Sequence, residues 1–125
     1  IVRERDIEDE VDFIKISSYG NSTTTSGTVR LLKDISADIT GRDIILIEDI
    51  VDTGLSLNFL KKRFEDASPN SLAFVTLLHK PHTSKIDFNI DHIGFEIGDE
   101  FVVGYGLDYK QKLRGLPSIY TLTKD

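Results

Sequence analysis

Hydrophobic and polar positions along this chain predict several strands and one helix. Alternating apolar and polar residues indicate half-buried strands, while the short, continuous apolar runs are typical of buried parallel strands. A helical pattern separates the two longest apolar runs, and the proline of the following segment, Pro69, cannot continue it. The order of elements favours an α/β domain with a mainly parallel sheet. Strands are expected at 11–17, 28–33, 43–48, 72–79, 91–97 and near 119–122, and the helix at 55–66.

Carboxylates, hydroxyls and a glycine follow the apolar run at 44–47 and lead into the predicted helix. Ligands of open α/β sheets gather where the strands end. A turn of this composition offers backbone N–H groups, hydroxyls and the positive end of a helix dipole to a phosphate. Carboxylates would repel that phosphate unless they hold a cation or sugar hydroxyls, which predicts a phosphorylated sugar with a divalent metal. The residues concerned are Glu48, Asp49, Asp52, Thr53, Gly54, Leu55 and Ser56.

Physical reasoning assigns a different task to each part of this segment. Gly54 has no Cβ, so the backbone there can approach a phosphate closely. Glu48 and Asp49 would accept hydrogen bonds from ribose hydroxyls and hold Mg²⁺ as hard oxygen ligands. Asp52 would lie at the edge of the turn, toward the side of the ribose that carries a base. The plain alternative is an ordinary strand-to-helix turn with Asp52 as the N-cap.

The contiguous segment 48–56 resembles the diphosphosugar-binding motif of the type I phosphoribosyltransferases. The resemblance implies their α/β fold, a mainly parallel twisted sheet flanked by helices, with a flexible catalytic loop and a small C-terminal hood region. It also implies that 52–56 bind the 5′-phosphate and that Glu48 and Asp49 bind the ribose. The hydroxyl-rich segment at 21–27 then becomes a closing lid, whereas alone it would read as an exposed linker.

Three further blocks resemble the hypoxanthine-guanine phosphoribosyltransferases, in the order of that family. The Ser18-Tyr19 pair and the loop that follows it are similar to the catalytic loop of that family. Arg114 stands at the position of an arginine that contacts pyrophosphate. Segments 76–81 and 101–109 match the purine-contacting parts. The resemblance implies Lys80, Phe101, Val102 and Asp108 as purine-binding residues, with Asp108 also a metal ligand beside Glu48 and Asp49.

General chemistry is compatible with these roles and leaves simpler ones open. Lys80 is a donor that would favour a 6-oxo over a 6-amino purine, but it would otherwise be a solvated lysine at a strand end. Phe101 would stack on a purine or pack in the core. Asp108 and Arg114 would equally form a surface salt bridge.

The resemblance implies transfer of 5-phosphoribosyl from phosphoribosyl diphosphate to hypoxanthine or guanine. The products would be a purine nucleoside monophosphate, IMP or GMP, and pyrophosphate. Mg²⁺ and Arg114 would neutralise the leaving group, Asp52 would take the purine N7 proton, and the closed loop would exclude water. A nucleotide-sensing regulatory domain and an enzyme for xanthine or a pyrimidine are the alternatives.

Composition restricts the partners and the number of domains. The 125 residues suit one domain, 1–125. A net charge of −6 argues against nucleic acid and anionic membranes. With no cysteine and no membrane-length apolar run, a cytoplasmic enzyme fits. Since the chain contains no methionine, we expect the family's N-terminal segment to be missing. The resemblance also implies a homodimer or homotetramer.

Overall fold

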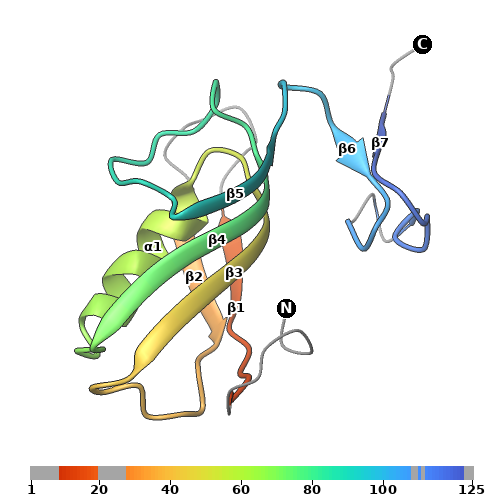
Figure 1. Ribbon diagram of the computed structural model, residues 1–125. Helices are drawn as coiled ribbons and strands as arrows, with labels where there is room; N and C mark the ends of the chain where they lie inside the picture. Colours follow the sequence, from red (N-terminus) through yellow and green to blue (C-terminus); the bar gives the residue numbers. More distant parts are fainter. Residues whose placement is uncertain (1–8, 20–27, 108–109, 111, 123–125) are drawn as a thin grey trace.

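The computed structural model describes residues 9–19, 28–107, 110 and 112–122, and these contain one helix and seven strands (Figure 1). The strand at 28–33 and the helix agree with the sequence prediction to within one residue. In order, the elements are β1 (Lys15–Tyr19), β2 (Thr28–Lys33), β3 (Asp43–Val51), α1 (Leu55–Glu65), β4 (Ser71–His79), β5 (His92–Glu96), β6 (Val102–Val103) and β7 (Tyr120–Thr121).

A three-stranded parallel sheet, in the order β3-β4-β5, forms the centre of the structure. β3 pairs with β4 from Asp43 opposite Ser71 to Val51 opposite His79, and β5 joins with His79 opposite Glu96. Because all three strands run in the same direction, their carboxyl ends meet at one edge, where sheets of this kind bind ligands. The predicted parallel sheet is confirmed, and antiparallel pairs β1-β2 and β6-β7 accompany it.

Helix α1 covers one face of this sheet with a single apolar stripe. Leu57, Leu60 and Phe64 are buried, and their spacing of three and four residues places them on one side of the helix. They pack with Leu46 and Phe74 of the sheet. Each fully buried side chain of this size stabilises the fold by about 2 kcal/mol. The helix thereby holds its N-terminus at the carboxyl end of β3.

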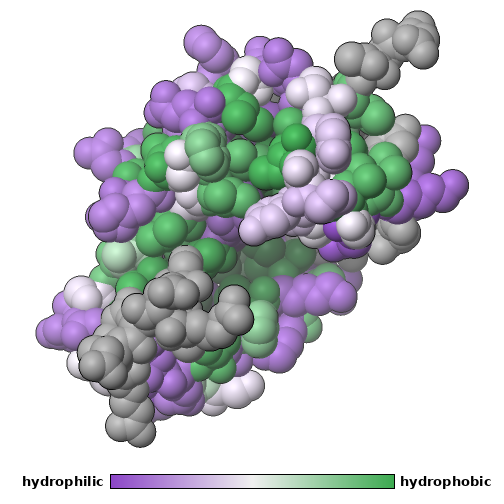
Figure 2. Space-filling view, turned by 45° about the vertical axis from the view of Figure 1, so that its right-hand side comes forward, coloured by the Kyte–Doolittle hydropathy of each residue, from purple (hydrophilic) through white to green (hydrophobic). Residues whose placement is uncertain are grey.

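The other face of β3 is not buried, which corrects the prediction of a strand enclosed on both sides. Ile45 and Ile47 are 46% and 54% exposed, while Leu46 between them is 7% exposed. In the described residues the only helix lies on the Leu46 side, so alternate residues of β3 face solvent. Figure 2 shows hydrophobic side chains across one face of the molecule, with a hollow between its upper and lower parts.

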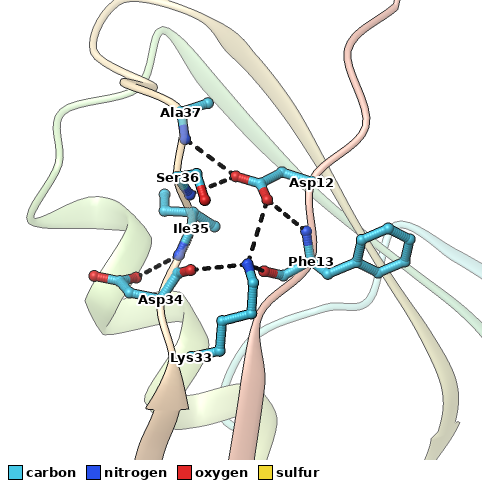
Figure 3. Close-up of polar contacts among 7 residues, drawn as sticks. All are labelled: Asp12, Phe13, Lys33, Asp34, Ile35, Ser36 and Ala37. Atoms are coloured by element: carbon cyan, nitrogen blue, oxygen red, sulfur yellow. Dashed lines mark hydrogen bonds and ion pairs between the residues drawn. The ribbon is translucent and has the colours of Figure 1, made fainter.

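The first strand begins four residues later than predicted, because Asp12 makes a different set of contacts. Its carboxylate accepts hydrogen bonds from the backbone N–H groups of Phe13, Ser36 and Ala37, at 2.8, 2.6 and 3.1 Å (Figure 3). Those bonds, with Lys33 nearby, lower the pKa of Asp12 to about 2. The chain at 11–13 is therefore tied to the segment after β2 rather than paired as a strand.

The β1-β2 hairpin is joined to α1 by an ion pair and by apolar packing. Arg63 of the helix contacts Asp34, which directly follows β2, at 2.5 Å. Ile16 and Ile35 pack against the core cluster from the same side. The predicted lid at 21–27 lies outside the described residues, but the two strands that would carry it are held against the helix.

Candidate functional site

The turn that follows β3 joins the parallel sheet to the N-terminus of α1. Gly54 is the N-cap residue of α1, with φ +85° in the left-handed region, and no side chain caps the helix. This conformation favours glycine, and a Cβ at this position would overlap the Cγ2 of Ile86. The interpretation of Asp52 as the N-cap is therefore wrong. The helix N-terminus, with Thr53 before it and Ser56 in its first turn, points its positive end toward this turn.

Glu48 and Asp49 lie within β3, because the strand continues to Val51 instead of ending at 48 as predicted. Asp49 is exposed, and its carboxylate accepts a hydrogen bond from the N–H of Ile50 at 2.7 Å. Glu48 is largely buried opposite Thr76 of β4. Burial, with a smaller contribution from the like charge of Asp49, raises the pKa of Glu48 from 4.5 to about 7.

This raised pKa predicts a pH-dependent stability. The native protein binds a proton at Glu48 more tightly than the unfolded chain, so the free energy of unfolding should fall as pH rises from 4.5 to about 7. Glu48→Gln should remove that loss and be more stable than the parent at pH 8 by about 2 kcal/mol. Urea unfolding at pH 4 and pH 8, in chelator, measures the difference. Glu100→Gln, at an exposed position, is the control. A Glu48→Gln variant less stable than the parent at pH 8 would contradict the assignment.

Lys80 and Asp52 form the closest charged pair at the carboxyl edge of the sheet. Lys80 follows β4, is only 6% exposed, and places its Nζ 3.5 Å from Oδ2 of Asp52. Its backbone N–H donates to the carbonyl of Val51 at 2.9 Å, which fastens the end of β4 to the end of β3. The alternative interpretation of Lys80 as a solvated lysine is wrong. Asp52 is half exposed, so one face of its carboxylate remains open to a ligand.

The remaining purine-binding candidates are not gathered beside Lys80 in the described part of the chain. Phe101 is 50% exposed, which argues against the core-packing alternative, and Val102 lies in β6. Figure 1 shows the β6-β7 pair set apart from the end of β4, beyond the edge where the parallel strands end. The linker 97–101 carries the chain away from the sheet. Val102, predicted without strand structure, pairs with Thr121.

Four other candidates remain to be placed. Arg114 donates a hydrogen bond to the carbonyl of Gly106 at 3.1 Å, within the segment that joins β6 and β7. Ser18 and Tyr19 end β1 rather than lying in the loop itself. Asp108 lies outside the described residues. The structure thus brings Lys80 to Asp52 at the end of β3, and it places Arg114 in the segment that joins β6 and β7.

The part of the chain that the structure describes contains no cluster of three or more acidic or histidine ligands that could form a metal centre. Glu48 and Asp49 still offer two hard oxygen donors at the expected place. Their mutual repulsion, which contributes to the raised pKa of Glu48, is what a bound divalent cation would relieve. Two oxygen donors suit the chemistry of Mg²⁺, which keeps several waters and takes its other ligands from substrate phosphates. None of the described helices is both long and apolar enough to cross a membrane.

One neighbour of Asp52 was not among the sequence candidates. Thr83, in the loop between β4 and β5, donates its hydroxyl hydrogen to Oδ1 of Asp52 at 2.6 Å. Thr83 and Asp52 are 31 positions apart, and the surrounding sequence has no pattern that would select this threonine. Only the folded loop brings it to the site.

The parallel sheet and the glycine turn before α1 agree with the fold of a phosphoribosyltransferase. The family model described as a phosphoribosyl transferase domain matches residues 5–110, and the chain belongs to that family. Within it, the chain groups with the hypoxanthine-guanine phosphoribosyltransferases, the enzymes of purine salvage. The enzyme of this name from Bacillus subtilis (strain 168) is 48% identical over 98% of this chain.

Solved structures agree with this assignment. A hypoxanthine-guanine phosphoribosyltransferase from Bacillus anthracis, with HEPES in its active site, is 48% identical and superposes with a TM-score of 0.91 over 98% of this chain and 72% of its own. A hypoxanthine phosphoribosyltransferase variant from Trypanosoma cruzi, complexed with the product IMP, has 40% identity and a TM-score of 0.85 over 94% of this chain. The chain spans 68% of the length of the Bacillus subtilis relative and 59% of that Trypanosoma cruzi structure.

Proposed function

We propose that the native-length protein transfers 5-phosphoribosyl from phosphoribosyl diphosphate to hypoxanthine or guanine, releasing pyrophosphate and IMP or GMP. The observation that carries this proposal is the buried Lys80 facing Asp52, beside the glycine turn that opens α1. A phosphate cradle, two sugar-binding carboxylates and a purine-facing donor then lie along one edge of the sheet. The IMP complex of the Trypanosoma cruzi relative supports a purine nucleotide as the ligand.

Each part of the site has a proposed task. The turn after β3 binds the 5′-phosphate through its backbone N–H groups and hydroxyls, and the carboxylates of β3 bind the ribose hydroxyls. Purine is bound by a donor, a stacking ring and backbone groups, and pyrophosphate by a basic residue with the end of β1. The phosphate residues are Asp52, Thr53, Gly54, Leu55 and Ser56; the ribose residues are Glu48 and Asp49; the purine residues are Lys80, Phe101, Val102 and Asp108; the pyrophosphate residues are Arg114, Ser18 and Tyr19.

Magnesium is the proposed cofactor, held by Glu48 and Asp49 with Asp108. When bound, it supplies positive charge that stabilises the leaving pyrophosphate. Its presence would also hold the Glu48 carboxylate ionised, against the burial that favours the neutral acid. The proposed oligomer, a dimer or tetramer, rests on the family resemblance, and the proposed cytoplasmic location rests on the composition of the sequence.

Asp52 and Lys80 act on the purine in this mechanism, one as a proton acceptor and the other as a hydrogen-bond donor. The half-exposed carboxylate of Asp52 accepts the proton of purine N7, and the electron pair of that N–H bond stays on the base. Lys80 donates a hydrogen bond to the 6-oxo oxygen, where negative charge increases as the proton leaves. Binding both groups along one edge of the sheet positions the purine nitrogen against the ribose carbon.

Parallel assays on four bases test the proposed function. Native-length protein is incubated with phosphoribosyl diphosphate, Mg²⁺ and hypoxanthine, guanine, xanthine or uracil, and nucleotide formation is measured with and without chelator. We expect nucleotide from hypoxanthine or guanine, and none in chelator. Turnover of xanthine or uracil alone would show a different base specificity. Nucleotide binding without turnover of any base would instead show a nucleotide sensor.

Replacing Lys80 tests the choice of base. Lys80→Ala removes the donor for the 6-oxo oxygen, so kcat/KM for hypoxanthine should fall by at least about tenfold, while the slow reaction with adenine should not fall. The ratio of the two kcat/KM values is the measurement. Lys85→Ala, an exposed lysine of the same loop, is the matched control. An unchanged ratio in Lys80→Ala would refute its assignment as the discriminating donor.

A further inference from the structure

The two carboxylate oxygens of Asp52 have different partners in the folded protein. Oδ1 accepts the hydrogen bond from the Thr83 hydroxyl at 2.6 Å, and Oδ2 faces the Nζ of Lys80 at 3.5 Å. The short hydrogen bond to a charged acceptor is the stronger of the two contacts. Because it engages one oxygen only, it fixes the rotation of the carboxylate and leaves the second oxygen directed toward Lys80.

Thr83 is itself held in place by backbone contacts on both sides of Asp52. The N–H of Lys80 donates to the carbonyl of Val51 at 2.9 Å, and the N–H of Lys85 donates to the carbonyl of Thr53 at 2.8 Å. Thr83 closes the turn between them, with its N–H 3.3 Å from the carbonyl of Lys80. The 80–85 turn is therefore hydrogen-bonded to the segment 51–53 at both of its ends. Between these two bonds, the Thr83 hydroxyl contacts Asp52.

The residue after this turn packs against the start of α1. Ile86, the residue after Lys85 in the chain, lies directly against Gly54, where no Cβ would fit. Thr83 is partly buried, whereas the carboxylate it contacts is half exposed. An exposed aspartate that lacked such a partner would sample several rotamers, and a proton acceptor is efficient only in one position relative to the base.

We propose that Thr83 is a positioning residue for catalysis, which holds the Asp52 carboxylate in the orientation that accepts the purine proton. This inference rests on the proposed function of Asp52 and names the residue on which that function depends. Thr83 does not touch the substrate in this account. It acts through Asp52, so its removal should slow the chemical step and leave the binding of both substrates in place.

The test separates turnover from binding. Thr83→Val replaces the hydroxyl by a methyl group of similar size, and kcat with hypoxanthine should fall about tenfold, the scale expected for a hydrogen bond to a charged group. KM for phosphoribosyl diphosphate should stay within about twofold of the parent value, because Thr83 does not contact this substrate in the ground state. Thr83→Ser keeps the hydroxyl and should restore kcat. Thr40→Val removes a hydroxyl that donates to the carbonyl of Ala67, outside the site, and is the matched control.

A double-variant cycle distinguishes positioning from a general structural role. In the Asp52→Asn background, adding Thr83→Val should lower kcat no further, because Thr83 acts through Asp52. An equal additional loss would overturn the proposal, as would unchanged kcat in Thr83→Val. If Thr83→Val does not fold, kcat of Thr83→Ala is compared with kcat of Thr83→Ser instead. An inactive parent protein, in contrast, would refute the proposed function itself.

Discussion

Replacing Asp52 with asparagine should lower kcat for nucleotide formation by about a thousandfold, the middle of the range for general acid–base groups. Asparagine keeps the size and one acceptor oxygen of the side chain, so the Thr83 hydroxyl retains a partner. It cannot accept a proton, so the N7 proton of the purine would have no acceptor at this point. Binding of IMP should be largely kept, because the phosphate turn and β3 are unchanged.

Steady-state kinetics and IMP titration together measure this effect. The buried Lys80 loses its charged partner in Asp52→Asn, which should lower the stability of the variant. Both measurements are therefore made at a temperature at which thermal unfolding shows that the variant is folded. Asp87→Asn, at an exposed position of the loop between β4 and β5, is the control and should behave as the parent. Equal losses of turnover and IMP affinity would contradict a role for Asp52 in proton transfer.

Gly54→Ala should damage both stability and phosphate binding. The left-handed φ of +85° disfavours any residue with a Cβ, and the added methyl would also collide with Ile86. We expect a loss of about 2 to 3 kcal/mol in the free energy of unfolding. Relaxation of the turn would move the N–H groups that face the phosphate, so KM for phosphoribosyl diphosphate should rise about tenfold or more.

A second glycine, Gly41, shows how much of the stability loss in Gly54→Ala comes from backbone strain and how much from the collision with Ile86. Gly41 has φ +73°, and a Cβ there would meet nothing within 4 Å. Gly41→Ala should therefore cost about 1 kcal/mol and leave KM unchanged. Urea unfolding gives the stabilities. In an Ile86→Ala background, the Gly54→Ala change should cost less than it does alone, because the collision is removed. Equal costs in both backgrounds would show that Ile86 does not limit this turn.

Local patterns predicted the strand-turn-helix unit that carries the phosphate site. The helix was predicted at 55–66 from a helical pattern between two apolar runs, and the structure shows that Leu57, Leu60 and Phe64 form its buried face. The turn residues were identified in the same way, because a glycine before a helix and adjacent carboxylates have direct local chemistry. The resemblance to a family then connected this unit to the purine-binding blocks.

Predictions failed where a distant residue competes with the local pattern. The alternating residues at 11–14 read as strand, but the Asp12 carboxylate binds the backbone of Ser36 and Ala37 instead. Ile45 and Ile47 read as buried, but whether a face is covered depends on what packs against it. The environment of Glu48 is likewise a result of packing, since its raised pKa comes mainly from burial.

The class of the fold, the glycine turn before α1 and the acidic pair of β3 could be predicted from the sequence, because each is encoded by residues close together in the chain. Tertiary structure alone decided that Lys80 is buried against Asp52 and that Thr83 holds the other oxygen of this carboxylate. Those contacts join segments about 30 residues apart in the chain, and they form only when the loop after β4 folds back over the end of β3. The orientation of the proposed proton acceptor is therefore a property of the folded loop.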